Sequence, residues 1–139
     1  FEIKENNAVP PLIGLASTPE NTLNLAANYA LDTSMGYFNF NANYYYRDDY
    51  LLFETSDLIQ QDAYGMMNVS VNWESIEGDW YGGIHAKNLT DEEYLVGGYD
   101  FVTRDPVDGS YGPGLGGDTT LIGYYGDPMT IQLTVGYRF

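Results

Sequence analysis

Histidine and cysteine are the scarcest chemically reactive residues in this chain. His85 is the only histidine and there is no cysteine, so neither a disulfide nor a thiolate metal site can form from these residues. No serine-centred nucleophile motif and no second histidine lie near His85, and catalysis needs such a constellation of groups. We therefore expect that the protein is not an enzyme, with no catalytic residue and no cofactor.

Carboxylates are plentiful and could in principle bind divalent cations. Asp48 and Asp49 form one group. A second group comprises Asp91, Glu92, Glu93, Asp100, Asp105, Asp108, Asp118 and Asp127. Calcium takes roughly six to eight oxygen ligands, and the twelve-residue calcium-loop pattern is absent. Solvated surface charge is the simpler interpretation, so we assign no metal-binding residue.

Glycine and tyrosine dominate the stretch between the fourth and fifth predicted strands. Gly97-Gly98 and the segment 112–117 do not join a strand to a helix, so they do not predict a phosphate-binding loop. They predict a long glycine-rich connection whose aromatic side chains could contact a substrate. The candidate contacts are Tyr99, Phe101, Tyr111, Tyr124 and Tyr125.

Composition excludes some classes of partner. The 139 residues contain 5 Lys and Arg against 20 Asp and Glu, a net charge of −15. Nucleic-acid binding needs a basic surface, so we expect no nucleic-acid partner. No apolar run reaches the roughly 18 residues that a transmembrane helix needs. The mean hydropathy of −0.30 does not exclude a membrane location, because transmembrane β-barrels alternate apolar and polar residues.

The last eleven residues define the pattern that organises the rest. From Met129 to Phe139 the odd positions are apolar and the even positions are polar or small, which predicts a strand with one apolar face. Most strands in soluble proteins have about five or six residues, whereas strands that cross an outer membrane have roughly 9–11. The length of this segment therefore favours a membrane strand.

The same alternation recurs four times earlier in the chain. It predicts strands at about 22–30, 37–46, 63–74 and 80–88, in addition to 129–139, after an irregular segment 1–21. The fold class that follows is all-β, an antiparallel meander of about five long strands spanning residues 1–139.

The connections between these strands alternate in length. Segments 31–36 and 75–79 are short, whereas 47–62 and 89–128 are long. Outer-membrane barrels have short periplasmic turns and long extracellular loops. Aromatic residues also fall at both ends of the strands, as in membrane barrels. The periplasmic set is Tyr29, Tyr37, Phe38, Trp73, Trp80, Tyr81, Tyr137 and Phe139, and the outer set is Tyr44, Tyr45, Tyr46 and Tyr64.

Three segments carry a resemblance to a known family. They are Pro19-Glu20-Asn21-Thr22-Leu23-Asn24-Leu25, Lys87-Asn88-Leu89-Thr90-Asp91-Glu92-Glu93-Tyr94 and the terminal Gly136-Tyr137-Arg138-Phe139. With them the chain resembles the C-terminal barrel segment of TonB-dependent outer-membrane receptors. The resemblance implies the last part of a 22-stranded transmembrane β-barrel. Asn88–Tyr94 is interpreted as structural, because Asn and Asp can start a turn there.

The resemblance also implies a function, a location and a set of partners. The parent protein would import a metal chelate, a vitamin or a glycan across the outer membrane of a Gram-negative bacterium. Its partners would be membrane lipid, the remainder of the barrel and plug, and TonB, which would contact a missing N-terminal part. The barrel-assembly machinery would recognise the terminal strand, through Leu133, Val135, Tyr137 and Phe139.

Two alternatives remain for the chain by itself. Segments 37–46 and 129–137 combine β-propensity, no proline and little charge, which favour cross-β stacking. A released receptor fragment could therefore self-assemble through its strand edges into an extracellular fibril with a structural role. A small barrel that closes by oligomerisation is the other alternative.

Overall fold

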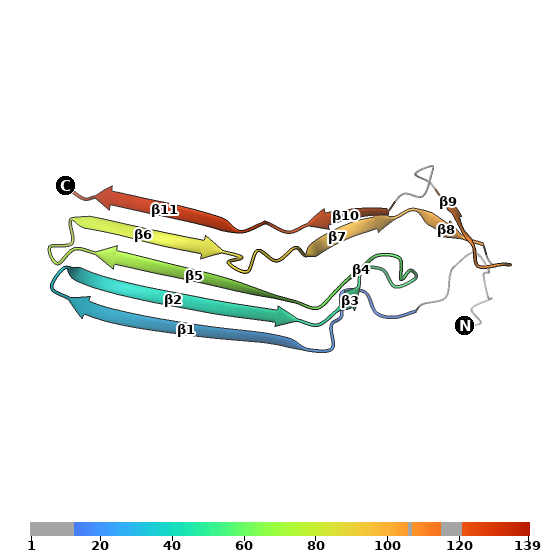
Figure 1. The fold of residues 1–139 in the computed structure, drawn as a ribbon, viewed down its shortest axis with the longest axis horizontal. Coiled ribbons are helices and arrows are strands. Elements are labelled where there is room, and N and C mark those ends of the chain that lie inside the picture. Colours follow the sequence, from blue (N-terminus) through green and yellow to red (C-terminus); the bar gives the residue numbers. More distant parts are fainter. Residues whose placement is uncertain (1–12, 106, 115–120) are drawn as a thin grey trace, which may run out of the picture. The chain divides into compact units, whose positions relative to one another are not determined.

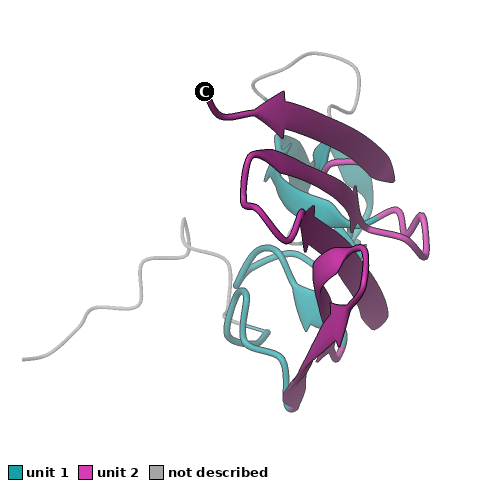
Figure 2. Ribbon diagram, turned by 90° about the vertical axis from the view of Figure 1, so that its left-hand side faces the viewer, with its two compact units in different colours: residues 1–20, 49–62, 94–125 teal, residues 21–48, 63–93, 126–139 magenta. Residues whose placement is uncertain are grey.

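The computed structural model describes residues 13–105, 107–114 and 121–139. The described chain divides into two units, and each unit consists of three separate segments of the chain (Figure 2). The sheet unit consists of residues 21–48, 63–93 and 126–139. The connection unit is drawn from residues 1–20, 49–62 and 94–125.

The sheet unit is a five-stranded antiparallel sheet in the order β1-β2-β5-β6-β11 (Figure 1). Its strands are β1 (Thr22–Thr33), β2 (Gly36–Arg47), β5 (Tyr64–Glu74), β6 (Trp80–Lys87) and β11 (Thr130–Tyr137). Each of these five strands pairs with the next one along the chain, so the predicted all-β antiparallel meander of five long strands is confirmed.

The register of the sheet aligns the alternation of one strand with that of the next. One row across the sheet consists of Tyr29, Phe40, Val71, Ile84 and Leu133. Directly paired residues in an antiparallel sheet lie on the same face, so all five strands turn their apolar positions to one side. A slip of one residue in any pair would break this agreement.

Several strand boundaries differ from the predicted ones. β1 continues to Thr33, so only Ser34 and Met35 separate β1 from β2, and Gly36 closes this connection at φ 126°. β6 ends at Lys87 because Asn88 adopts a positive φ of 48° and leaves the strand. β11 pairs over Thr130–Tyr137, which is shorter than the predicted 129–139.

The connection unit corrects the prediction that 47–62 and 89–128 are loops without strands. The described residues of these segments form six short strands, in three antiparallel pairs. They are β3 (Tyr50–Leu51) with β4 (Gln60–Gln61), β7 (Leu95–Asp100) with β10 (Leu121–Tyr125), and β8 (Val102–Arg104) with β9 (Tyr111–Pro113). Glycine within these segments hid the strand pattern, because Gly98 pairs directly with Gly123 and neither carries a side chain.

Few described residues are buried. The buried apolar residues are Ile59, Tyr64 and Ala86, and the buried polar ones are Gln61 and Asn88. Most apolar side chains of the sheet unit are half-buried or exposed. The stability of the sheet therefore cannot come from an enclosed hydrophobic core of its own.

Candidate functional site

The apolar face of the sheet is open along its last two strands. Leu133 is 70% exposed and Ile84, its direct partner on β6, is 53% exposed. Val135 is exposed to 67%, and Tyr137 is also exposed. Three of the four residues predicted for the terminal strand, Leu133, Val135 and Tyr137, thus lie in β11 on this face, and Phe139 follows the strand.

Aromatic rings gather at the end of the sheet that carries the short connections. The rings of Trp80 and Tyr137 are 4.9 Å apart and those of Tyr137 and Phe139 are 5.1 Å apart, between centroids. Trp73 Nε1 donates a hydrogen bond of 3.0 Å to the carbonyl oxygen of Met35 in the two-residue connection. At the opposite end Tyr45 and Tyr64 form a second contact, at 6.3 Å.

The polar face is held together by side-chain amides. Asn28 Nδ2 donates to Asn41 Oδ1 at 2.6 Å and to Asn39 Oδ1 at 3.1 Å, which links β1 to β2. Asn41 Nδ2 in turn donates to Ser70 Oγ on β5 at 3.3 Å. A second pair joins Asn43 Nδ2 to Asn24 Oδ1 at 2.6 Å. These bonds connect β1 to β2 and β2 to β5 through their side chains.

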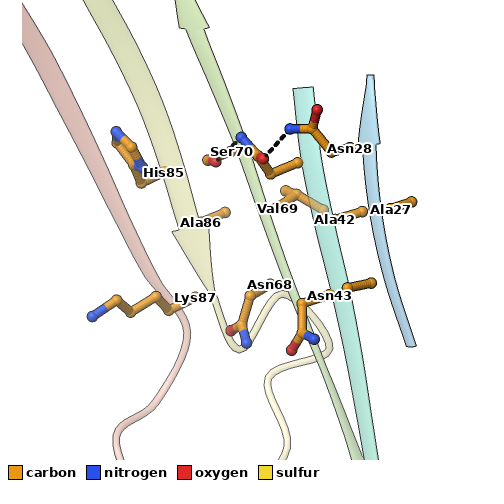
Figure 3. Close-up of a pocket in the computed structure, with 12 residues that line it drawn as sticks. Ala27, Asn28, Ala42, Asn43, Asn68, Val69, Ser70, His85, Ala86 and Lys87 are labelled. Carbon is orange, nitrogen blue, oxygen red and sulfur yellow. Dashed lines mark hydrogen bonds between the residues drawn. The ribbon is translucent and has the colours of Figure 1, made fainter. Parts of the chain in front are cut away.

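A hollow of about 430 Å³ lies among these polar residues. Figure 3 shows Asn28, Ser70 and His85 in one row and Asn43, Asn68 and Lys87 in another. Ala27, Ala42, Val69 and Ala86 lie between the two rows along their strands and also line the hollow, but strand alternation turns their side chains to the opposite face. His85 therefore lies on the polar face beside a serine and amides.

Arg138 fastens the end of β11 to the connection between β5 and β6. Its Nη1 lies 2.7 Å from Glu74 Oε1 and donates to the carbonyl oxygen of Gly78 at 3.0 Å. Its guanidinium carbon is 4.8 Å from the ring centroid of Tyr81. That ring covers Gly136, where a Cβ atom would overlap it. We call Glu74, Tyr81, Gly136 and Arg138 the terminal clasp.

Asn88 joins three segments at the other end of the sheet. It is 3% exposed, and its Nδ2 donates to the carbonyl oxygens of Glu92 at 2.9 Å and Asp127 at 3.1 Å. Its Oδ1 accepts a hydrogen bond from the backbone N–H of Glu92 at 2.9 Å, and the backbone N–H of Asn88 donates to Asn68 Oδ1. These bonds support the structural interpretation of the segment Asn88–Tyr94.

Three of the five candidate substrate contacts come together in the connection unit. The rings of Tyr99 and Phe101 are stacked with centroids 5.6 Å apart, and Tyr124 meets Tyr99 edge-on at 5.8 Å. We call Tyr99, Phe101 and Tyr124 the aromatic triad. Tyr99 lies in β7, Phe101 directly follows β7, and Tyr124 lies in β10.

The other two candidates lie apart from the triad. Tyr111 is in β9 beneath the guanidinium of Arg104, 6.0 Å from its ring centroid. Both residues line a cleft of about 170 Å³ together with Asp57 and Asp100. Tyr125 follows Tyr124 along β10, so its side chain points to the opposite side of that strand.

Two carboxyl groups, of half-buried Asp48 and exposed Asp108, have a lowered pKa. Hydrogen bonds from Asn21 Nδ2 at 2.7 Å and from the Tyr46 hydroxyl at 2.8 Å hold the pKa of Asp48 below its usual value. A hydrogen bond from Ser110 lowers the pKa of Asp108. Neither belongs to a group of three or more potential metal ligands within the described residues, where no such group occurs. Asp118 lies outside the described residues.

Sequence reasoning missed the terminal clasp and the amide network. Arg138 and Glu74 are 64 residues apart in the chain, and no local pattern connects them. Asparagine recurs at positions 39, 41 and 43 of the predicted strand 37–46, and this spacing of two residues was the available sequence signal for the network. No helix in residues 13–105, 107–114 and 121–139 is long and apolar enough to cross a membrane. No protein-family model, curated protein or solved structure matches the chain.

Proposed function

We propose that this chain forms wall strands and extracellular connections of a TonB-dependent outer-membrane receptor. The parent protein would take up a scarce nutrient, of the class of metal chelates, vitamins or glycans. The single observation that carries the proposal is one continuous apolar face across five long strands, exposed in the sheet and backed by a polar face.

Water is a poor environment for that apolar face. Monomeric soluble proteins rarely expose contiguous apolar patches larger than a few hundred Å². Lipid would cover the apolar side, while the polar side would face a lumen, as in outer-membrane barrels. The three longest strands have 12, 12 and 11 residues, enough for the roughly 9–11 residues that a tilted membrane strand needs.

The two ends of the sheet support an orientation. The connections Ser34–Met35 and 75–79 are short and would be periplasmic, whereas the segments on the opposite side are long and would be extracellular. The rings of Trp80, Tyr137 and Phe139 would then lie at the periplasmic interface, where aromatic residues favour the headgroup region.

The partners follow from this location. Lipid would contact the apolar face, and the remaining barrel strands would pair with the outer edges of β1 and β11. The plug would lie against the polar face, and TonB would act on another part of the parent protein. The barrel-assembly machinery would recognise β11 and Phe139, so deletion of Phe139 should lower the amount of receptor in the outer membrane. Unchanged amounts would remove that part of the proposal.

Single-cysteine labelling tests the membrane location, because the chain has no native cysteine. Spin labels would be placed at Leu133 and, as the matched control on the opposite face, at Gln132 in the full-length protein in vesicles. We expect the label at Leu133 to be accessible to oxygen, which concentrates in lipid, and the label at Gln132 to a water-soluble nickel complex. Equal access to the nickel complex at both positions would contradict the proposal.

The fibril is a second candidate, favoured by the outer edges of β1 and β11. Within the described residues neither edge pairs with another strand of the sheet, and such edges can template pairing between chains. Asparagine rows and stacked aromatic rings also stabilise cross-β assemblies. Fibre diffraction from the purified 139-residue chain tests it, with a reflection near about 4.7 Å expected. A soluble monomer with cooperative unfolding would contradict it.

A further inference from the structure

The aromatic triad presents ring surface to the solvent. Tyr99 is 50% exposed and Tyr124 is 48% exposed, and both sit on the same face of the β7–β10 pair. Between them, Gly97 pairs with Tyr124 and leaves space, since a Cβ atom there would meet only the Tyr124 ring, at 4.0 Å. The triad is therefore reachable by a small ligand.

The opposite face of the same strand pair is anchored. A Cβ atom at Gly98 would lie 2.8 Å from Ile59 Cδ1, so the absence of a side chain lets Ile59 pack directly on the backbone. Ile59 is buried, and the Tyr50 hydroxyl donates to the Leu95 carbonyl oxygen at 3.3 Å. Gln61 Oε1 also accepts the Leu95 amide proton. One face of the β7–β10 pair is therefore packed against Ile59, and the triad on the other face points to the solvent.

The charged residues of the connection unit that carries the triad are mostly of one sign. Arg104 is the one basic residue among the described residues of the connection unit. The acidic ones are Glu20, Asp49, Glu54, Asp57, Asp62, Asp100, Asp105 and Asp108. A surface of this composition attracts cations and repels anions over roughly the Debye length, about 8 Å at physiological ionic strength.

Aromatic faces favour the same sign of ligand. The π-system of a tyrosine is negative on its face and attracts ammonium and guanidinium groups. The chain itself uses this contact, with Arg104 over Tyr111 and Arg138 over Tyr81. Since Arg104 already lies over Tyr111, the connection unit has no other basic side chain among its described residues to offer the triad.

We propose that Tyr99, Phe101 and Tyr124 bind a ligand through an organic cation, an alkylammonium or quaternary ammonium group. The acidic side chains and the negative faces of the rings both favour a cationic ligand, and neither favours an anionic chelate. The binding site stands on the connection unit alone. Only the identification of its ligand as the transported nutrient rests on the proposed function.

Choline and its uncharged isostere 3,3-dimethylbutan-1-ol are the probes. They have nearly the same shape and differ in the positive charge, so their comparison isolates the cation. Binding to the full-length protein in detergent would be followed by saturation-transfer NMR at low salt. We expect choline to bind at least about threefold more tightly than the isostere, with the difference shrinking as salt rises. Equal binding of the two probes would overturn the proposal.

Variants locate the site. Tyr124→Leu removes a ring of the triad and should weaken choline binding by about two- to fivefold, while Tyr124→Phe retains the ring and most of the affinity. Tyr125→Leu is the matched control, because Tyr125 is the next residue on β10 and points to the other side. Choline binding that falls equally in both leucine variants, or in neither, would overturn the assignment to the triad.

The two proposals fail separately. Loss of choline binding with Leu133 still in lipid would remove the site and leave the receptor proposal intact. Selective choline binding by a protein whose Leu133 is not in lipid would leave the site intact and remove the receptor proposal.

Discussion

The two faces of the five-stranded sheet are stabilised in different ways. On the polar face the side chains bond to one another, as in the contacts of Asn28 with Asn41 and of Arg138 with Glu74. On the apolar face Leu133 and Val135 remain largely exposed and contact little. The polar face is therefore linked by hydrogen bonds and an ion pair, whereas the apolar face has a few ring contacts, such as Trp80 with Tyr137, and otherwise depends on what covers it.

A charged residue on the apolar face should have the largest effect on stability. Leu133→Arg places a cation on the apolar face and should destabilise the folded protein in vesicles by about 2–4 kcal/mol if the residue lies near the bilayer midplane. Gln132→Arg, one residue away on the polar face, should cost far less. Urea unfolding followed by tryptophan fluorescence measures both, and equal losses would mean that the two faces have the same environment.

Crowding the terminal clasp tests the polar face. Gly136→Val adds side-chain atoms where the Tyr81 ring lies, and overpacking of this kind costs about 1–3 kcal/mol. Because the cause is the ring, the additional change Tyr81→Ala should restore part of the lost stability. If the second change lowers stability further, the ring does not cover Gly136 in the way described.

The ion pair of the clasp should contribute less. The side chains of Arg138 and Glu74 are 56% and 46% exposed, so solvent screens their attraction. Arg138→Met should therefore cost at most about 1 kcal/mol, and less at high salt. A double-mutant cycle with Glu74→Gln measures the coupling. A coupling well above that limit would show that the pair is better shielded than its exposure indicates.

The smallest expected effect is a pH dependence at the end of β2. The pKa of Asp48 is lower in the folded state because Asn21 and Tyr46 donate hydrogen bonds to its carboxylate. Its contribution is present above the unfolded-state pKa and is lost as pH falls through the folded-state pKa. Asn21→Ala removes the first donor and should flatten the acid limb of the stability–pH curve. An unchanged acid limb in this variant would contradict the assignment.

Alternation was sufficient to predict the faces of the sheet, because a period of two is set by strand geometry alone. It could not predict β7 and β10, where Gly97, Gly98 and Gly123 interrupt the pattern. Nor could it predict contacts between distant residues, such as Arg138 with Glu74. The aromatic triad was predicted as a set of candidates, but its separation from Tyr111 and Tyr125 depends on strand pairing that only the structure shows.

The alternating register has a consequence for the kinds of genetic variation that these strands can accept. Deleting one codon within β11 would move every later side chain to the other face, whereas deleting two codons would preserve the faces and shorten the strand. Substitutions within one face, such as Leu133→Ile, should be frequent among natural variants. Single-codon insertions and deletions should instead be confined to the long connections. No described segment there is paired on both sides, so a shift of one residue does not exchange two established faces of a sheet.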